Sequence, residues 1–149
     1  MPLRTANEAD YLRLVKIWEA AVRATHDFLE EADIAYLRPL IAAAYLPSVD
    51  LVAHVDAGGR PQAFCGTHED KIEMLFVHPS VHGQGIGRRL VENAIVSQGI
   101  AWVDVNEQNS QAVGFYRHLG FEIFRRSPTD AQGRPFPILH LRLGSDLAA

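Results

Sequence analysis

The 149-residue sequence predicts one domain, residues 1–149, of the mixed α+β class. Three observations predict this class. Two helical patterns come first, three short strand-like runs then follow one another through turns, and the chain ends as helix, strand, helix and two strands. Because strands and helices do not alternate throughout, a fully parallel sheet is disfavoured and a mixed sheet is favoured.

The N-terminal elements begin with a short apolar run at residues 2–5. The polar segment Asn7-Glu8-Ala9-Asp10 follows and is typical of a helix cap. Apolar side chains then recur at helical spacing, which predicts a helix to about Ala24. The same spacing from Ile34 to Tyr45 predicts a second helix that ends before Pro47.

After Pro47 the spacing of apolar residues changes from helical to strand-like, and the remaining elements follow from this change. Residues 51–55, 62–67 and 71–77 read as three strands joined by turns at 56–61 and 68–70, and Pro79 closes the third. We then expect, in order, a helix at 86–97, a strand at 100–105, a helix at 109–119, a strand at 121–125, a loop at 127–135 and a strand at 137–143.

Composition excludes several classes of protein. A net charge of −4 without a basic run argues against nucleic acid as a partner. The single cysteine, Cys65, excludes an intrachain disulfide and a multi-cysteine metal site, and we expect no metal. No apolar run approaches the length of a membrane span, and Met1–Thr5 does not resemble a secretion signal. We therefore expect a cytoplasmic protein without a membrane partner.

The most informative segment is Val81-His82-Gly83-Gln84-Gly85-Ile86-Gly87-Arg88-Arg89-Leu90. Its alternate glycines lie between a predicted strand and a predicted helix, and glycine is kept where φ is positive or where a ligand approaches the backbone. The N-terminus of the helix would direct unpaired N–H groups and a positive dipole end at one point. Such a loop is suited to an anion, above all phosphate, although a turn without a ligand is the alternative.

Two familiar phosphate loops do not match this segment. A nucleoside-triphosphate loop requires Gly-Lys followed by Ser or Thr, whereas Gly87 is followed by Arg88-Arg89. A dinucleotide fingerprint requires a third glycine where Leu90 stands. Proteins that bind ATP or NAD are therefore disfavoured.

Two further motifs accompany the loop. His82-Gly83-Gln84-Gly85-Ile86-Gly87 has the spacing Gln/Arg-x-x-Gly-x-Gly/Ala, with His82 in place of Gln or Arg. The segment from Asn109 to Phe121 reads Asn-x-x-Ala-x-x-Phe-Tyr-x-x-x-Gly-Phe, and Leu75-Phe76-Val77-His78-Pro79 ends the preceding strand. Over nearly its whole length the chain thus resembles the GCN5-related N-acetyltransferases, the GNAT family.

Within this family the chain looks most like the small bacterial acetyltransferases of the YjaB type. That resemblance rests on residues 24–29, 105–109 and 130–137. It implies a GNAT-type α+β fold, with a central mixed, mostly antiparallel twisted sheet of about six to seven strands flanked by about four helices. It implies transfer of an acetyl group from acetyl-CoA to a primary amine of a small molecule or a peptide, by direct attack in a ternary complex, and possible homodimers. A regulatory module that binds coenzyme A without transfer is the alternative.

The resemblance also implies which residues bind the coenzyme. The backbone of Leu75, Phe76 and Val77 would pair with the pantetheine arm and donate an N–H to the thioester oxygen. Asn109 would contact pantetheine, unless it is only a helix N-cap. The expected coenzyme-binding residues are Leu75, Phe76, Val77, His82, Gly83, Gln84, Gly85, Ile86, Gly87, Arg88, Asn109 and Tyr116.

Three residues are candidates for catalysis. By resemblance Tyr116 lies beside the coenzyme sulfur, where a protonated phenol can act as a general acid. Glu73 alternates with Leu75 and so would share a strand face with Lys71 and Val77, which makes its carboxylate a candidate base. His26 is the rival base. The acceptor pocket would draw on Trp18, His26, Phe28, Tyr36, Tyr45 and Phe136, although packing in the core is the alternative for the aromatic residues. The Thr25-His26-Asp27-Phe28 cluster is the expected specificity element.

Overall fold

A computed structural model of the chain describes residues 2–26 and 29–144. It contains a seven-stranded sheet in the order β1-β2-β3-β4-β5-β7-β6, in which only the β4–β5 pair is parallel. The expected mixed, mostly antiparallel α+β architecture is confirmed. The elements are β1 Leu3–Thr5, α1 Tyr11–Thr25, α2 Glu31–Leu40, β2 Asp50–Val55, β3 Pro61–His68, β4 Lys71–Val77, α3 Ile86–Gln98, β5 Trp102–Asn106, α4 Ser110–His118, β6 Phe121–Ser127 and β7 Ile138–Leu143.

The second helix differs from the predicted one at both ends. It begins earlier, at Glu31, where Glu30 and Asp33 form a reciprocal capping box. It ends at Leu40 and continues as a π-helical turn over Ile41–Tyr45. Pro39 explains the change, because proline has no N–H and its ring obstructs the carbonyl one turn earlier. The apolar spacing persists through the wider turn, so periodicity alone could not locate the boundary.

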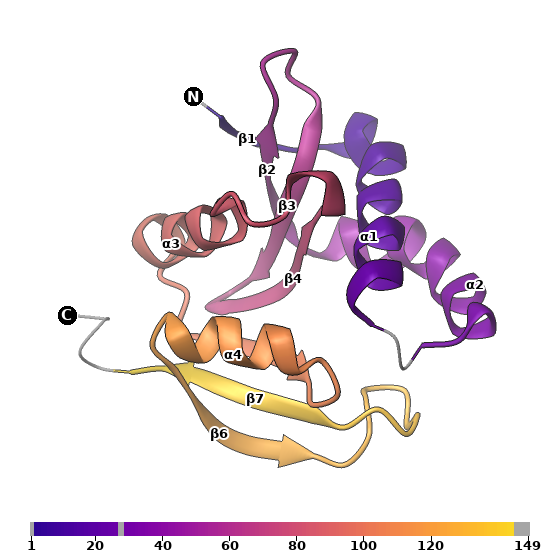
Figure 1. Cartoon of the computed structure of the whole chain (residues 1–149), viewed down its shortest axis with the longest axis vertical. Coiled ribbons are helices and arrows are strands. Elements are labelled where there is room, and N and C mark those ends of the chain that lie inside the picture. The colour runs from indigo at the N-terminus through magenta and orange to yellow at the C-terminus, as the bar shows by residue number, and fades with distance from the viewer. Residues whose placement is uncertain (1, 27–28, 145–149) are drawn as a thin grey trace.

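Two hydrophobic cores cover opposite faces of the sheet. α1 and α2 lie on one side of the first four strands, and α3 lies on the other, while α4 packs beside β5 and β6 (Figure 1). The first core contains the fully buried Leu14, Ile17 and Phe64. The second contains Leu90 and Leu141 and joins α3 to α4. The two cores bury both faces of β2–β4, and a gap separates these strands from the β5-β7-β6 half of the sheet.

That gap is a fork between β4 and β5. The two strands pair only at Lys71↔Trp102 and Ile72↔Val103, and beyond these residues they separate. β4 also carries a bulge, since Gly66 pairs with Met74 while Thr67 pairs with Ile72, which leaves Glu73 as the extra residue. Ile72 consequently packs in the same core as Leu75 and Val77, whereas Met74 and Phe76 face the other side. The prediction of unbroken alternation from Lys71 to Val77 is therefore wrong.

Within the described residues, the helices are too short or too polar to span a lipid bilayer.

Candidate active site

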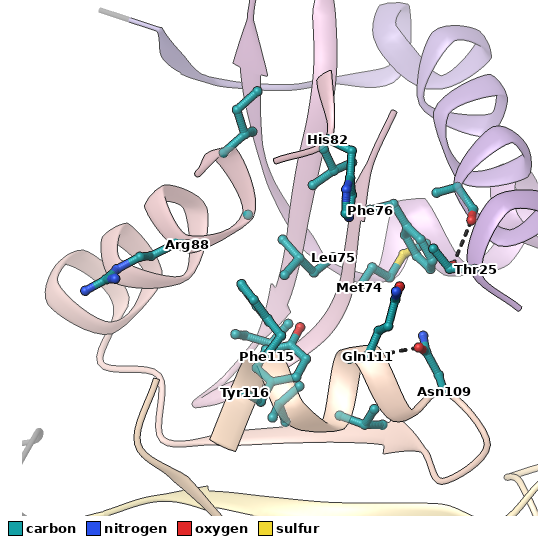
Figure 2. Close-up of a pocket in the computed structure, with 18 of the residues that line it drawn as sticks. Thr25, Met74, Leu75, Phe76, His82, Arg88, Asn109, Gln111, Phe115 and Tyr116 are labelled. Atoms are coloured by element: carbon teal, nitrogen blue, oxygen red, sulfur yellow. Dashed lines mark hydrogen bonds between the residues drawn. The ribbon is translucent and has the colours of Figure 1, made fainter. Parts of the chain in front are cut away.

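A cavity of about 540 Å³ occupies the fork. Its walls come from β4 and β5, from the loop and first turn of α3, from α4, and from the last turn of α1. Figure 2 shows Leu75 on β4 facing Tyr116 and Phe115 on α4 across this space. Because β5 no longer pairs with β4 here, one edge of β4 is open to the cavity and can hydrogen-bond an extended ligand.

The glycine loop forms one end of the cavity. Gly83 and Gly85 have φ values of +82° and +75°, and a Cβ on either would meet nothing within 4 Å, so backbone conformation alone explains these glycines. Gly87 differs, since a Cβ there would make ordinary van der Waals contacts, 3.6 Å from Val77 and 3.5 Å from Phe115, so neither its φ nor its packing requires glycine. The loop holds its backbone close to the cavity.

The start of α3 completes an anion-binding arrangement. Gly85 is its N-cap and has no side chain to occupy the first N–H groups, and the first turn carries no acidic residue. Ile86 and Arg88 in that turn line the cavity. A helix N-terminus of this kind favours a negatively charged group, so the loop fits a phosphate or pyrophosphate.

Tyr116 packs between two aromatic rings. Its ring centroid lies 5.0 Å from that of Phe115 and 5.6 Å from that of Phe121, both edge-to-face, and only 5% of the residue is exposed. The hydroxyl group points from α4 toward Leu75 (Figure 2). Burial, with a smaller effect of Cys65, raises the pKa of Tyr116 well above 10, so the phenol keeps its proton at neutral pH.

Cys65 on β3 is not suited to act as a nucleophile. Its thiol is buried in β3, and burial raises its pKa to about 12. A thiol in such surroundings is inert, because the thiolate is the reactive form.

His26 and Asn109 join α1 to α4 across the cavity. Thr25 donates its hydroxyl hydrogen to the carbonyl of Ala21, so it accepts a hydrogen from His26 Nδ1 at 2.8 Å. The Asn109 Oδ1 atom accepts from the Ala112 N–H and caps α4, which turns its Nδ2 group toward His26 Nε2 at 3.3 Å. Both ring nitrogens of a neutral His26 are thus engaged, and the Nε2 lone pair already accepts a hydrogen.

Glu73 lies where the fork opens. Its carboxylate is one-third exposed and stands 3.9 Å from Lys71 Nζ, beyond hydrogen-bond distance. On the facing strand Asp104 also lines the cavity and binds Lys71 Nζ at 2.9 Å. Asp104 is thus paired with Lys71, and Glu73 is the carboxylate at the fork that Lys71 does not hydrogen-bond, which suits a cationic amine.

Most residues predicted from sequence converge on this cavity. Gln84 is the exception among the fourteen, since it is exposed and lies outside the lining. The lining includes His26, Glu73, Leu75, Phe76, Val77, His82, Gly83, Gly85, Ile86, Gly87, Arg88, Asn109 and Tyr116. Sequence reasoning missed Asp104, Gln111 and Phe115; only the last two had a local signal, in the α4 motif.

The aromatic side chains predicted for an acceptor pocket, so far as the structure describes them, lie outside this cavity. Trp18 is 3% exposed and packs in the α1 core, because its helical spacing points it inward. Tyr36 and Phe136 instead stack on the guanidinium of Arg134, at 5.1 and 5.2 Å, and Tyr45 binds Gln132. None of these four aromatic residues lines the cavity. Asp27 and Phe28, also predicted for this region, lie outside the described residues.

No group of three His, Cys, Asp or Glu side chains suited to a metal ion occurs among residues 2–26 and 29–144.

Known proteins resemble this chain in both sequence and fold. Residues 50–123 match the family model of the acetyltransferase (GNAT) domain. The peptidyl-lysine N-acetyltransferase YjaB of Salmonella typhimurium is 40% identical, over 93% of this chain and 95% of its own. The solution structure of apo-form YjaB from Escherichia coli has a TM-score of 0.87 and 38% identity, covering 94% and 95% of the two chains.

A more distant structure shares the fold. It is yncA from Salmonella typhimurium, solved with its cofactor acetyl-CoA, with a TM-score of 0.64 and 20% identity over 95% of this chain and 91% of that one. The loop, the α4 motif and the YjaB relatives agree with one another and favour a transferase over a binding module. The chain belongs to the GNAT family and is an acetyl-CoA-dependent N-acetyltransferase.

Proposed function

We propose that the protein acetylates the side-chain amine of lysine in a peptide or protein, by direct attack on acetyl-CoA in a ternary complex. The observation that carries this proposal is the Glu73 carboxylate at the opening of the fork, beside the open edge of β4. The YjaB relatives, named peptidyl-lysine N-acetyltransferases, support the choice of lysine among primary amines.

The coenzyme would lie along the fork. Its pyrophosphate fits the backbone of Gly83–Gly87 and the start of α3, with Arg88 and His82 nearby. Its pantetheine arm would pair with the open edge of Leu75–Val77 and contact Asn109. An N–H of this edge would then stabilise the thioester oxygen as it becomes negative.

Glu73 is the base that we favour for the acceptor. A lysine side chain arrives as an ammonium ion and must lose one proton before its nitrogen can attack the carbonyl carbon. Glu73 accepts that proton and passes it to water. His26 is less suitable, because its Nε2 lone pair already accepts from Asn109.

Tyr116 is the acid that we favour for the leaving group. As the carbon–sulfur bond breaks, the sulfur takes the phenol proton, and the nitrogen of the new amide returns its second proton to Tyr116. The net reaction releases one proton to water and yields coenzyme A and an acetamide. The buried hydroxyl beside Leu75 supports this role, since it remains protonated at neutral pH.

Acetyl transfer to a lysine-containing peptide with a blocked N-terminus tests the proposal. We expect release of coenzyme A and a mass increase at lysine, whereas an otherwise identical peptide with norleucine in its place should remain unmodified. Glu73→Gln should lower kcat about 10²-fold and leave the acetyl-CoA Kd unchanged. Transfer to small amines alone would contradict the choice of lysine, and an unchanged kcat would contradict the role of Glu73.

A further inference from the structure

A chain of hydrogen-bonded side chains crosses the sheet beside the fork. Four neighbouring strands contribute one residue each, and they are Lys71 on β4, Asp104 on β5, His140 on β7 and Ser127 on β6. Lys71 Nζ lies 2.9 Å from Asp104 Oδ2, and His140 Nδ1 lies 2.7 Å from Asp104 Oδ1. Ser127 Oγ lies 2.7 Å from His140 Nε2. Asp104 is the member of this network that lines the cavity.

The directions of these bonds fix the orientation of Asp104. An ionised carboxylate accepts only, so His140 donates its Nδ1 hydrogen to Oδ1. In a neutral His140 the Nε2 atom then accepts the hydroxyl hydrogen of Ser127. With one oxygen committed to His140, the other oxygen of Asp104 faces Lys71.

Lys71 therefore stands between two carboxylates and pairs closely with one. Its Nζ atom is 2.9 Å from Asp104 and 3.9 Å from Glu73. Partial burial lowers the pKa of Lys71 and Arg125 on β6 lowers it further, but Asp104 and Glu73 outweigh both and the pKa is raised overall. Lys71 thus remains a cation that binds whichever carboxylate is available.

We propose that Asp104 is a positioning residue, which holds the Lys71 ammonium group away from Glu73 and so keeps the Glu73 carboxylate available to the acceptor amine. This inference rests on the proposed function of Glu73 as the base. His140 and Ser127 serve it by holding Asp104 in place.

The consequence concerns the strength of Glu73 as a base. A cation in direct contact stabilises the charged form of a carboxyl group, which makes the carboxylate a weaker base. It would also neutralise the charge that attracts an ammonium ion. At 3.9 Å Lys71 makes no hydrogen bond to Glu73, and an acceptor can do so instead.

Asp104→Asn tests this arrangement with little change of shape. The introduced carboxamide keeps the shape of the side chain but carries no negative charge, so the ion pair that holds the Lys71 ammonium group is lost. Lys71 should then move closer to Glu73, until the two side chains are in hydrogen-bond contact. We expect kcat to fall about tenfold, the acidic limb of the pH–rate profile to move to lower pH, and the acetyl-CoA Kd to stay the same.

The double variant Lys71→Met/Asp104→Asn separates this mechanism from a structural one. With no ammonium group to capture Glu73, kcat and the acidic limb should recover to near the wild-type values. Glu107→Gln is the matched control, because it also breaks an ion pair between neighbouring elements of this half of the sheet, with Arg126 at 2.6 Å, but lies outside the cavity. It should leave both quantities unchanged, and thermal melting of each variant checks folding.

Three results would overturn the inference. If Asp104→Asn keeps the wild-type kcat and acidic limb while Glu73→Gln is impaired, Glu73 is the base but Asp104 does not protect it. If the double variant is as impaired as Asp104→Asn, Asp104 acts directly rather than through Lys71. If Glu73→Gln itself keeps the wild-type kcat, the proposed role of Glu73 fails, and the inference fails with it.

Discussion

Removing one oxygen atom from Tyr116 separates its chemical role from its packing role. Tyr116→Phe keeps the ring that packs edge-to-face on Phe115 and Phe121, so the free energy of unfolding should change by less than about 1 kcal/mol. The missing hydroxyl can no longer protonate the departing thiolate. General acid assistance is worth about 10²–10⁴ in rate, which corresponds to about 3–5 kcal/mol of activation free energy.

The assay is single-turnover acetyl transfer to a lysine peptide at saturating acetyl-CoA, beside calorimetric measurement of the acetyl-CoA Kd. We expect the single-turnover rate constant to fall at least about 10²-fold and the Kd to change less than about threefold. Because the raised pKa keeps Tyr116 protonated up to about pH 10, wild-type activity should show no alkaline decline from this residue below that pH. Unchanged turnover in Tyr116→Phe would refute the reasoning.

Two further substitutions test the loop and the N-terminal cap. Gly85→Ala should weaken acetyl-CoA binding about tenfold by calorimetry, because alanine at φ +75° costs about 1–2 kcal/mol and shifts the loop backbone. The control Gly59→Ala, at φ +84° in the β2–β3 turn, should lower stability but keep the Kd. Equal Kd values for the two variants would contradict the proposed role of the glycine loop in binding the coenzyme. Asp10→Asn should lower the free energy of unfolding near pH 7, because the hydrogen bond from Arg4 holds the pKa of Asp10 below its usual value. Solvent screens part of this interaction, so the expected loss is about 1 kcal/mol. Since a lowered pKa stabilises the fold only above the unfolded-state value, the difference measured by urea unfolding should shrink as the pH falls below about 4, and a constant difference would exclude this ionic origin.

The parts of the site predicted from sequence are those encoded by local signals. Glycines at alternate positions before a helix define the loop because φ and helix termini are properties of adjacent residues. The α4 motif places Asn109 and Tyr116 on one helix, seven residues apart, and therefore on the same face. These two segments carried the prediction of the coenzyme site, and both line the cavity.

The parts that escaped prediction depend on long-range pairing. The bulge at Glu73 arises from the register of β4 against β3, which no alternation pattern within β4 reveals. Asp104 meets His140 only because β5 and β7 pair in register, 36 residues apart in sequence. Trp18 illustrates the converse error, since its helical spacing is equally compatible with a core position, which it occupies.

A crystal structure of the protein with a bisubstrate analogue, in which coenzyme A is joined through its acetyl carbon to a peptide lysine, tests the central claim most directly. We predict that the pantetheine arm lies between β4 and β5 and that the pyrophosphate contacts the backbone of Gly83–Gly87. The lysine nitrogen should contact the Glu73 carboxylate directly or through one bridging water molecule. A lysine nitrogen placed on the opposite side of the fork, away from Glu73, would contradict the account.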